Sequence, residues 1–166
     1  MRYAELPTTD VESYIEARPD RVWDLVTDIE LIAEISSELT RVEWQDGTDS
    51  PCVGAVFVGH NFHTAMGEWR TTSFVIECDR PRVFAWAVTD VANPSSIWRF
   101  TLRPDGAGTV LNQWAQIGPG RSGLNYAIDA MPDKEERIIA RRLVEFRAGM
   151  TANLARIKEL GEAARA

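Results

Sequence analysis

Metal-binding and redox residues are scarce in this chain of 166 residues. It has two cysteines, Cys52 and Cys78, and two histidines, His60 and His63. No CxxC pair, HExxH motif or third histidine occurs, and residues three apart in a strand point to opposite faces. We therefore expect no metal site and no cofactor, and two reduced, unpaired thiols in a cytoplasmic setting.

Sequence signatures of nucleotide and membrane chemistry are also missing. There is no P-loop, GxGxxG or GxSxG motif, and Gly118-Pro119-Gly120 is typical of a loop. No apolar run approaches the ~20 residues of a membrane-spanning helix, and residues 1–10 are too polar for a signal peptide. These absences predict a soluble cytoplasmic protein without stable membrane insertion.

Positive charge is in deficit, with 18 Lys and Arg residues against 25 Asp and Glu residues. The resulting net charge of -7 and pI near 4.9 argue against nucleic acid or an anionic membrane as the partner. Hydrophobic residues make up 45% of the chain, which is enough for one domain spanning residues 1–166 with its own core.

The clearest pattern present is an amphipathic helix over residues 133–164. Its apolar side chains recur at steps of three and four, at Ile139, Leu143, Phe146, Met150, Leu154, Ile157 and Leu160. The other face is charged and expected to be solvated, with Glu135, Glu136, Arg141, Arg142, Glu145, Arg147, Arg156, Lys158 and Glu159. Gly149 interrupts the helix and suggests close packing or a slight bend.

Strand patterns and turn signals occupy most of the remaining sequence. Alternation predicts strands over residues 11–17, 39–45, 54–63, 68–79, 83–89, 97–103 and 109–117. Pro19 begins a helix, and a second short helix over 29–35 is capped by Asp28. Short connections favour antiparallel neighbours, so we predict an α+β fold in which a curved seven-stranded sheet wraps around the long helix. Such a sheet encloses more volume than one helix fills, which favours a ligand cavity.

The segment before the long helix is ambiguous. Residues 118–123 are rich in glycine, and residues 124–131 are apolar enough for one or two helical turns. This composition suits a lid over a cavity and equally suits a plain connector.

Several sequence blocks together resemble a known superfamily. They are residues 17–28 (ARPDRVWDLVTD), 53–61 (VGAVFVGHN), 69–73 (WRTTS) through 84–86, 98–100 (WRF), 105–109 (DGAGT) and the closing helix. Over essentially the whole chain they are similar to the START/Bet v 1-like (SRPBCC) superfamily, in its polyketide cyclase/dehydrase and lipid transport branch. The resemblance implies a helix-grip fold with two short helices between strands 1 and 2. It leaves function open, because the superfamily includes hydrophobic-ligand carriers, hormone receptors and aromatase/cyclases.

Candidate ligand-binding residues follow from the strand face assumed to point inward. We take the Asn61 face of strand 54–63 as inward, because a glycine at position 59 leaves room and an asparagine can orient a ligand. Aromatic residues on neighbouring strands and on the helix complete a pocket for a flat ligand. The predicted set is Phe57, Gly59, Asn61, His63, Trp69, Thr71, Trp86, Trp98, Phe100, Tyr126, Phe146 and Met150.

Two functions fit this pattern. The first is binding of a hydrophobic small molecule, such as a lipid, isoprenoid or polyketide, driven by burial of apolar area. The alternative is an aromatase/cyclase or dehydratase, which needs a base and an enolate-stabilising donor; His63, Asn61, Tyr126 and Glu68 are the candidates. We favour binding, because apolar volume is abundant and titratable groups hardly converge. A third interpretation, an assembly module that uses the sheet face as a dimer patch, stays open. The protein is expected to be a monomer or a homodimer.

Overall fold

A computed structural model describes residues 1–48 and 50–163. The strands are β1 (Thr8–Ile15), β2 (Leu39–Trp44), β3 (Val56–His63), β4 (Gly67–Asp79), β5 (Val83–Val88), β6 (Ser96–Asp105) and β7 (Gly108–Ile117). The helices are α1 (Pro19–Val26), α2 (Ile29–Ile35), α3 (Gly123–Ala130) and α4 (Glu135–Ala163), with short 3-10 turns η1 (Tyr3–Glu5) and η2 (Pro132–Lys134).

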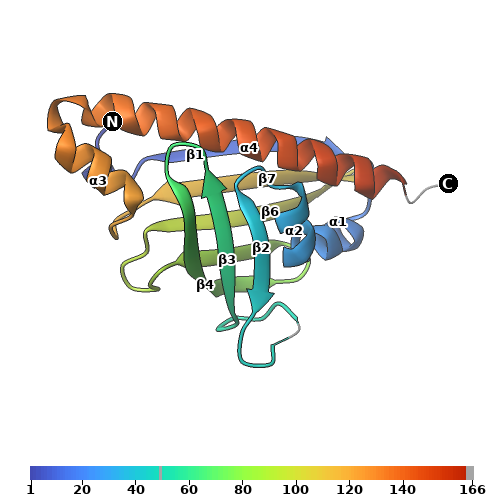
Figure 1. Cartoon of the computed structure of the whole chain (residues 1–166). Coiled ribbons are helices and arrows are strands. Elements are labelled where there is room, and N and C mark those ends of the chain that lie inside the picture. Colours follow the sequence, from blue (N-terminus) through green and yellow to red (C-terminus); the bar gives the residue numbers. More distant parts are fainter. Residues whose placement is uncertain (49, 164–166) are drawn as a thin grey trace.

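All seven strands form one antiparallel sheet in the order β1-β7-β6-β5-β4-β3-β2. From β2 to β7 each strand pairs with the next along the chain, and β1 pairs with β7. The sheet curves beneath α4, which runs along it (Figure 1). The predicted α+β helix-grip architecture, with a long C-terminal helix and two short helices between β1 and β2, is therefore confirmed.

The two short helices form where local signals placed them. Pro19 stands at the first position of α1, where its missing N–H is harmless. Asp28 caps α2 by accepting the backbone N–H of Leu31 at 3.0 Å. Trp23 of α1 is buried and meets the ring of Phe84 edge-on, at 6.3 Å between centroids. The contact between Trp23 and Phe84 holds α1 against the sheet, and α2 lies beside β2 (Figure 1).

Some predicted boundaries were wrong by two or three residues. β1 begins at Thr8 instead of Val11 and ends at Ile15. β3 begins at Val56, because Gly54 has a φ of 88° and belongs to the preceding turn. Residues 132–134 form η2, so α4 begins at Glu135, and its predicted last residue, Ala164, lies outside the described residues.

The long helix is attached chiefly to β1. Arg147 and Lys158 donate hydrogen bonds to the backbone carbonyls of Asp10 and Tyr14, both at 2.7 Å. Gly161 is buried so close to β1 that a Cβ there would lie 3.2 Å from Cγ2 of Ile15. With one flank of α4 held on β1, its other flank faces the inner surface of the sheet.

Among residues 1–48 and 50–163, no helix is long and apolar enough to cross a membrane.

Candidate ligand cavity

Strand register decides which face of β3 points inward. Phe57, Gly59 and Asn61 pair with Ser73, Thr71 and Trp69 of β4, and all six side-chain positions lie on one face of the sheet. These positions line a cavity between the sheet and α4. The Asn61 face is thus the inner one, as we predicted.

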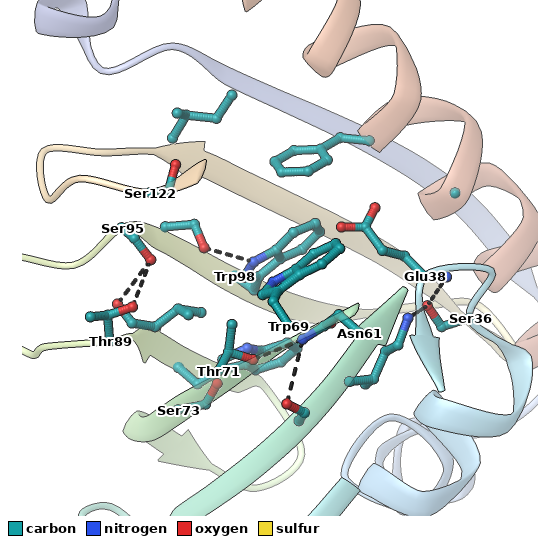
Figure 2. Close-up of a pocket in the computed structure, with 18 of the residues that line it drawn as sticks. Ser36, Glu38, Asn61, Trp69, Thr71, Ser73, Thr89, Ser95, Trp98 and Ser122 are labelled. Atoms are coloured by element: carbon teal, nitrogen blue, oxygen red, sulfur yellow. Dashed lines mark hydrogen bonds between the residues drawn. The ribbon is translucent and has the colours of Figure 1, made fainter. Parts of the chain in front are cut away.

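The cavity has a volume of about 530 Å³. Residues from β3 to β7, α3 and α4 surround it, and the segment that joins α2 to β2 closes one side (Figure 2). Of the residues predicted to bind ligand, these line it: Phe57, Gly59, Asn61, Trp69, Thr71, Trp86, Trp98, Tyr126, Phe146 and Met150. Their role in binding stays a prediction.

Two predicted residues lie elsewhere. His63 is at the end of β3, where its Nδ1 accepts the N–H of Ala65 at 3.1 Å and its Nε2 lies 3.7 Å from Glu145. Phe100 is fully buried in the core beneath the cavity, with its ring 6.1 Å from that of Trp86. Strand alternation identified the correct face for both, but it could not show how far along each strand the cavity extends.

Aromatic rings build a continuous wall. Trp86 is surrounded by Phe57 at 5.9 Å, Phe84 at 5.5 Å and Phe100 at 6.1 Å between ring centroids. Trp98 meets Phe146 of α4 at 4.7 Å. Rings in edge-on or tilted contact hold each other in place, so the wall offers a flat ligand a rigid apolar surface.

Two glycines behave differently from the sequence prediction. Gly59 lines the cavity, but a Cβ there would lie 2.8 Å from Leu39 Cδ1 and 3.1 Å from Thr71 Oγ1, so the position has no space for a side chain of its own. A Cβ at Gly149 would meet nothing within 4 Å, so the expected close packing was wrong. The open space lies instead at Gly149, which lines the cavity from α4.

Hydroxyl groups cover another part of the wall (Figure 2). Asn61 donates to Thr71 Oγ1 at 3.2 Å, and the hydroxyls of Thr89 and Ser95 are 3.0 Å apart. Trp98 Nε1 donates to the hydroxyl of Ser96 at 3.2 Å. The cavity therefore combines an aromatic surface with polar groups that can meet oxygen substituents.

A charged cluster at the cavity was missed by the sequence analysis, which placed Arg142 and Glu145 on a solvated face. The Arg142 side chain is only 12% exposed and holds Glu38 through two hydrogen bonds of 2.5 and 3.1 Å. Its Nη1 also lies 3.2 Å from Glu145, and its guanidinium stacks on Phe146 at 4.5 Å. The physical reason is that the segment before β2 covers this side of α4 and removes it from solvent.

The cluster also sets the protonation of Glu145. Burial raises the pKa of this carboxyl, but hydrogen bonds from Arg142 and Arg141 and the nearby charges of Arg142 and His63 lower it more. The net pKa lies below the ordinary value, so Glu145 is ionised and a weak base.

Two buried amides were missed as well. Gln113 of β7 is 3% exposed and lines the cavity, and its Oε1 has no hydrogen-bond partner within the part of the chain that is described. Asn153 of α4 is 8% exposed and lines the cavity too. A glutamine alternating with Leu111 and Ala115, and an asparagine on the apolar stripe of the helix, were signals that the sequence already held.

The proposed catalytic residues do not converge. Asn61 lies in the cavity, whereas Tyr126 is 78% exposed on α3 and meets only its rim. Glu68 is exposed on the opposite face of β4, and His63 lies beside Glu145. Within residues 1–48 and 50–163, no group of three or more His, Cys, Asp or Glu residues could hold a metal ion.

Helix α3 covers one end of the cavity. Ser122 caps it by accepting the N–H of Leu124 at 3.3 Å, and its own N–H donates to Asn125 at 2.7 Å. Leu124 and Tyr126 line the cavity. The segment thus occupies the place of a lid, and its movement stays a prediction.

Comparisons with known proteins support the fold. The family model described as polyketide cyclase/dehydrase and lipid transport matches residues 7–162. A polyketide-cyclase-like protein from Corynebacterium glutamicum has a solved structure that is 30% identical, with a TM-score of 0.65 over 92% of this chain and 90% of that chain. A protein from Thermus thermophilus is 16% identical, with a TM-score of 0.68 over 96% of this chain and 100% of that chain.

A larger protein also shares the fold. The di-domain ARO/CYC StfQ from the steffimycin biosynthetic pathway is 14% identical and has a TM-score of 0.71. The match covers 98% of this chain and 53% of that chain, so this chain spans about half of the di-domain protein. No curated protein sequence matches the chain significantly.

Proposed function

This chain belongs to the polyketide cyclase/dehydrase and lipid transport family, and from that premise we propose that it binds a hydrophobic small molecule between the sheet and α4. The observation that carries this proposal is the cavity of about 530 Å³ walled by Trp86, Trp98 and Phe146. A flat ligand that buries roughly 300 Å² of apolar area gains about 7 kcal/mol before the entropy of association is subtracted.

Catalysis is the second candidate, as an aromatase/cyclase or dehydratase acting on a polyketide-type substrate. The hydroxyl-lined wall favours it, because Asn61 and Thr71 could hold the oxygens of a polyketone. The missing part is a base: Glu38 and Glu145 are both paired with Arg142, and the pKa of Glu145 is lowered. A base with a low pKa removes a carbon-bound proton poorly, so binding is the function that the site supports better.

The test is native mass spectrometry of the purified protein, followed by extraction and identification of any molecule that co-purifies. We expect an apolar adduct on the wild type, and its loss in Gly149→Phe, whose ring would enter the open space beside that residue. An adduct retained at equal occupancy in Gly149→Phe would show that the molecule does not lie in this cavity.

A wild-type protein without any adduct, and without affinity for added flat aromatic probes, would contradict binding. Turnover of a poly-β-ketone that falls in Asn61→Ala would then favour the enzyme. The cytoplasmic location and the monomeric or homodimeric state stay predictions.

A further inference from the structure

One side chain in the cavity wall lacks the partner that burial normally demands. Gln113 is 3% exposed, and its Oε1 accepts no hydrogen bond from residues 1–48 or 50–163. A buried amide oxygen without a partner destabilises a folded protein, which makes such groups rare. Because Gln113 lines the cavity, an incoming molecule can supply the missing donor once the amide turns toward it.

The surroundings of Gln113 are apolar and uncharged. Its cross-strand neighbours are Phe100 on β6 and Val11 on β1, and the next residues on its own face are Leu111 and Ala115. No charged side chain belongs to this set, so a ligand carboxylate placed here would be buried without a counter-ion. A neutral donor fits the site better.

Helix α4 gives the cavity two unlike ends. Residues 142, 145, 146, 149, 150 and 153 line it at helical spacing. From Arg142 to Asn153 the helix rises about 16 Å. The first end carries the Arg142 cluster with Glu38 and Glu145, and the second carries the neutral, buried amide of Asn153.

We propose that Gln113 is a specificity-determining residue that accepts a hydrogen bond from a hydroxyl group of a neutral, flat, ring-containing ligand. This inference rests on the proposed binding function and names the chemistry that the same cavity selects. A hydroxyl suits an amide whichever way the amide is oriented, because it both donates and accepts. Plain hydrocarbons and acyl chains leave Gln113 unpartnered, whereas a hydroxylated ring satisfies it.

The experiment compares two probes of nearly equal shape, 2-naphthol and 2-methylnaphthalene, by quenching of tryptophan fluorescence. Trp69, Trp86 and Trp98 line the cavity and report binding. The measured quantity is the Kd of 2-methylnaphthalene divided by the Kd of 2-naphthol, in the wild type and in Gln113→Met. The two probes differ in hydration free energy, but this difference contributes equally to the ratio in both proteins. It therefore cancels when the two ratios are compared. We expect this ratio to fall about five- to tenfold in the variant.

Gln116→Met is the matched control, since Gln116 lies on the same strand, faces outward and donates to the carbonyl of Gly118 at 3.0 Å. It should leave the ratio unchanged. Gln113→Met should also fold, and its ligand-free melting temperature should rise by about 2–4 °C because an unpartnered polar group is removed.

The outcomes separate the two proposals. Equal ratios in the wild type and Gln113→Met, with both probes bound, would overturn the role of Gln113 and leave hydrophobic binding intact. Failure of both probes to bind the wild type would instead contradict the proposed function.

Discussion

Replacing Gly149 by alanine should stabilise the protein. An alanine in the interior of a helix is favoured over glycine by about 1 kcal/mol. The added methyl would meet no atom within 4 Å, so no steric cost opposes this gain. For a chain of this size the expected rise in melting temperature is about 2–4 °C.

The same helix provides a control for this prediction. At Gly161 an added Cβ would lie 3.2 Å from Ile15 Cγ2 and 3.6 Å from both Ala17 Cβ and Leu25 Cδ1. Gly161→Ala gains a similar helix preference but must shift the buried Ile15 side chain, so its net stabilisation should be smaller or negative. Because both variants gain the same helix preference, the difference between their free energies of unfolding measures the cost of packing the added methyl at Gly161.

The assay is urea unfolding of ligand-free protein followed by circular dichroism, with the free energy of unfolding extrapolated to water. If Gly149→Ala is less stable than the wild type, or gains no more than Gly161→Ala, the assignment of open space to position 149 is refuted. A ligand-loaded sample would confuse the result, because the methyl enters the volume in which a ligand would lie.

The charged cluster yields two further predictions. Arg142→Met should lower the free energy of unfolding by about 2–4 kcal/mol in urea titrations, because it leaves Glu38 without its cation and leaves Glu145 with Arg141 alone. An unchanged value would mean that the ion pair between Arg142 and Glu38 is solvated. Glu145 has a lowered pKa when folded, so its stabilising effect is complete above its unfolded pKa and is lost as the pH falls through the folded pKa. The stability difference between the wild type and Glu145→Gln should therefore shrink as the pH falls below about 6, and a difference that stays constant on acidification would contradict the pairing with Arg142 and Arg141.

Local sequence patterns were sufficient for the architecture. Pro19 and Asp28 mark helix starts through backbone chemistry that acts within one turn, and both helices form there. The alternation around Asn61 identified the inner face of β3, since the pleat of a strand fixes the side of every second residue.

The candidate site could not be predicted fully, because parts of it depend on contacts between residues that are far apart in the sequence. Arg142 is partly buried because Glu38, which is 104 residues away in sequence, covers it. The sequence shows Gln113 alternating with apolar residues, but only the sheet register shows that Phe100 and Val11 flank it on the neighbouring strands. Its charge predicted that Arg142 is exposed to solvent. This prediction was wrong, because a segment distant in the sequence covers the side chain.

The pairing of β1 with β7 has a consequence for the order in which the protein is made. Strands β2 to β6 meet neighbours that are close in sequence, so this part of the sheet can assemble as the chain emerges from the ribosome. β1 is synthesised first, yet its partner strand begins at Gly108 and the helix that covers it begins at Glu135. β1 therefore stays unpaired until β7 has been translated, and during that interval its edge is open to chaperones and to aggregation.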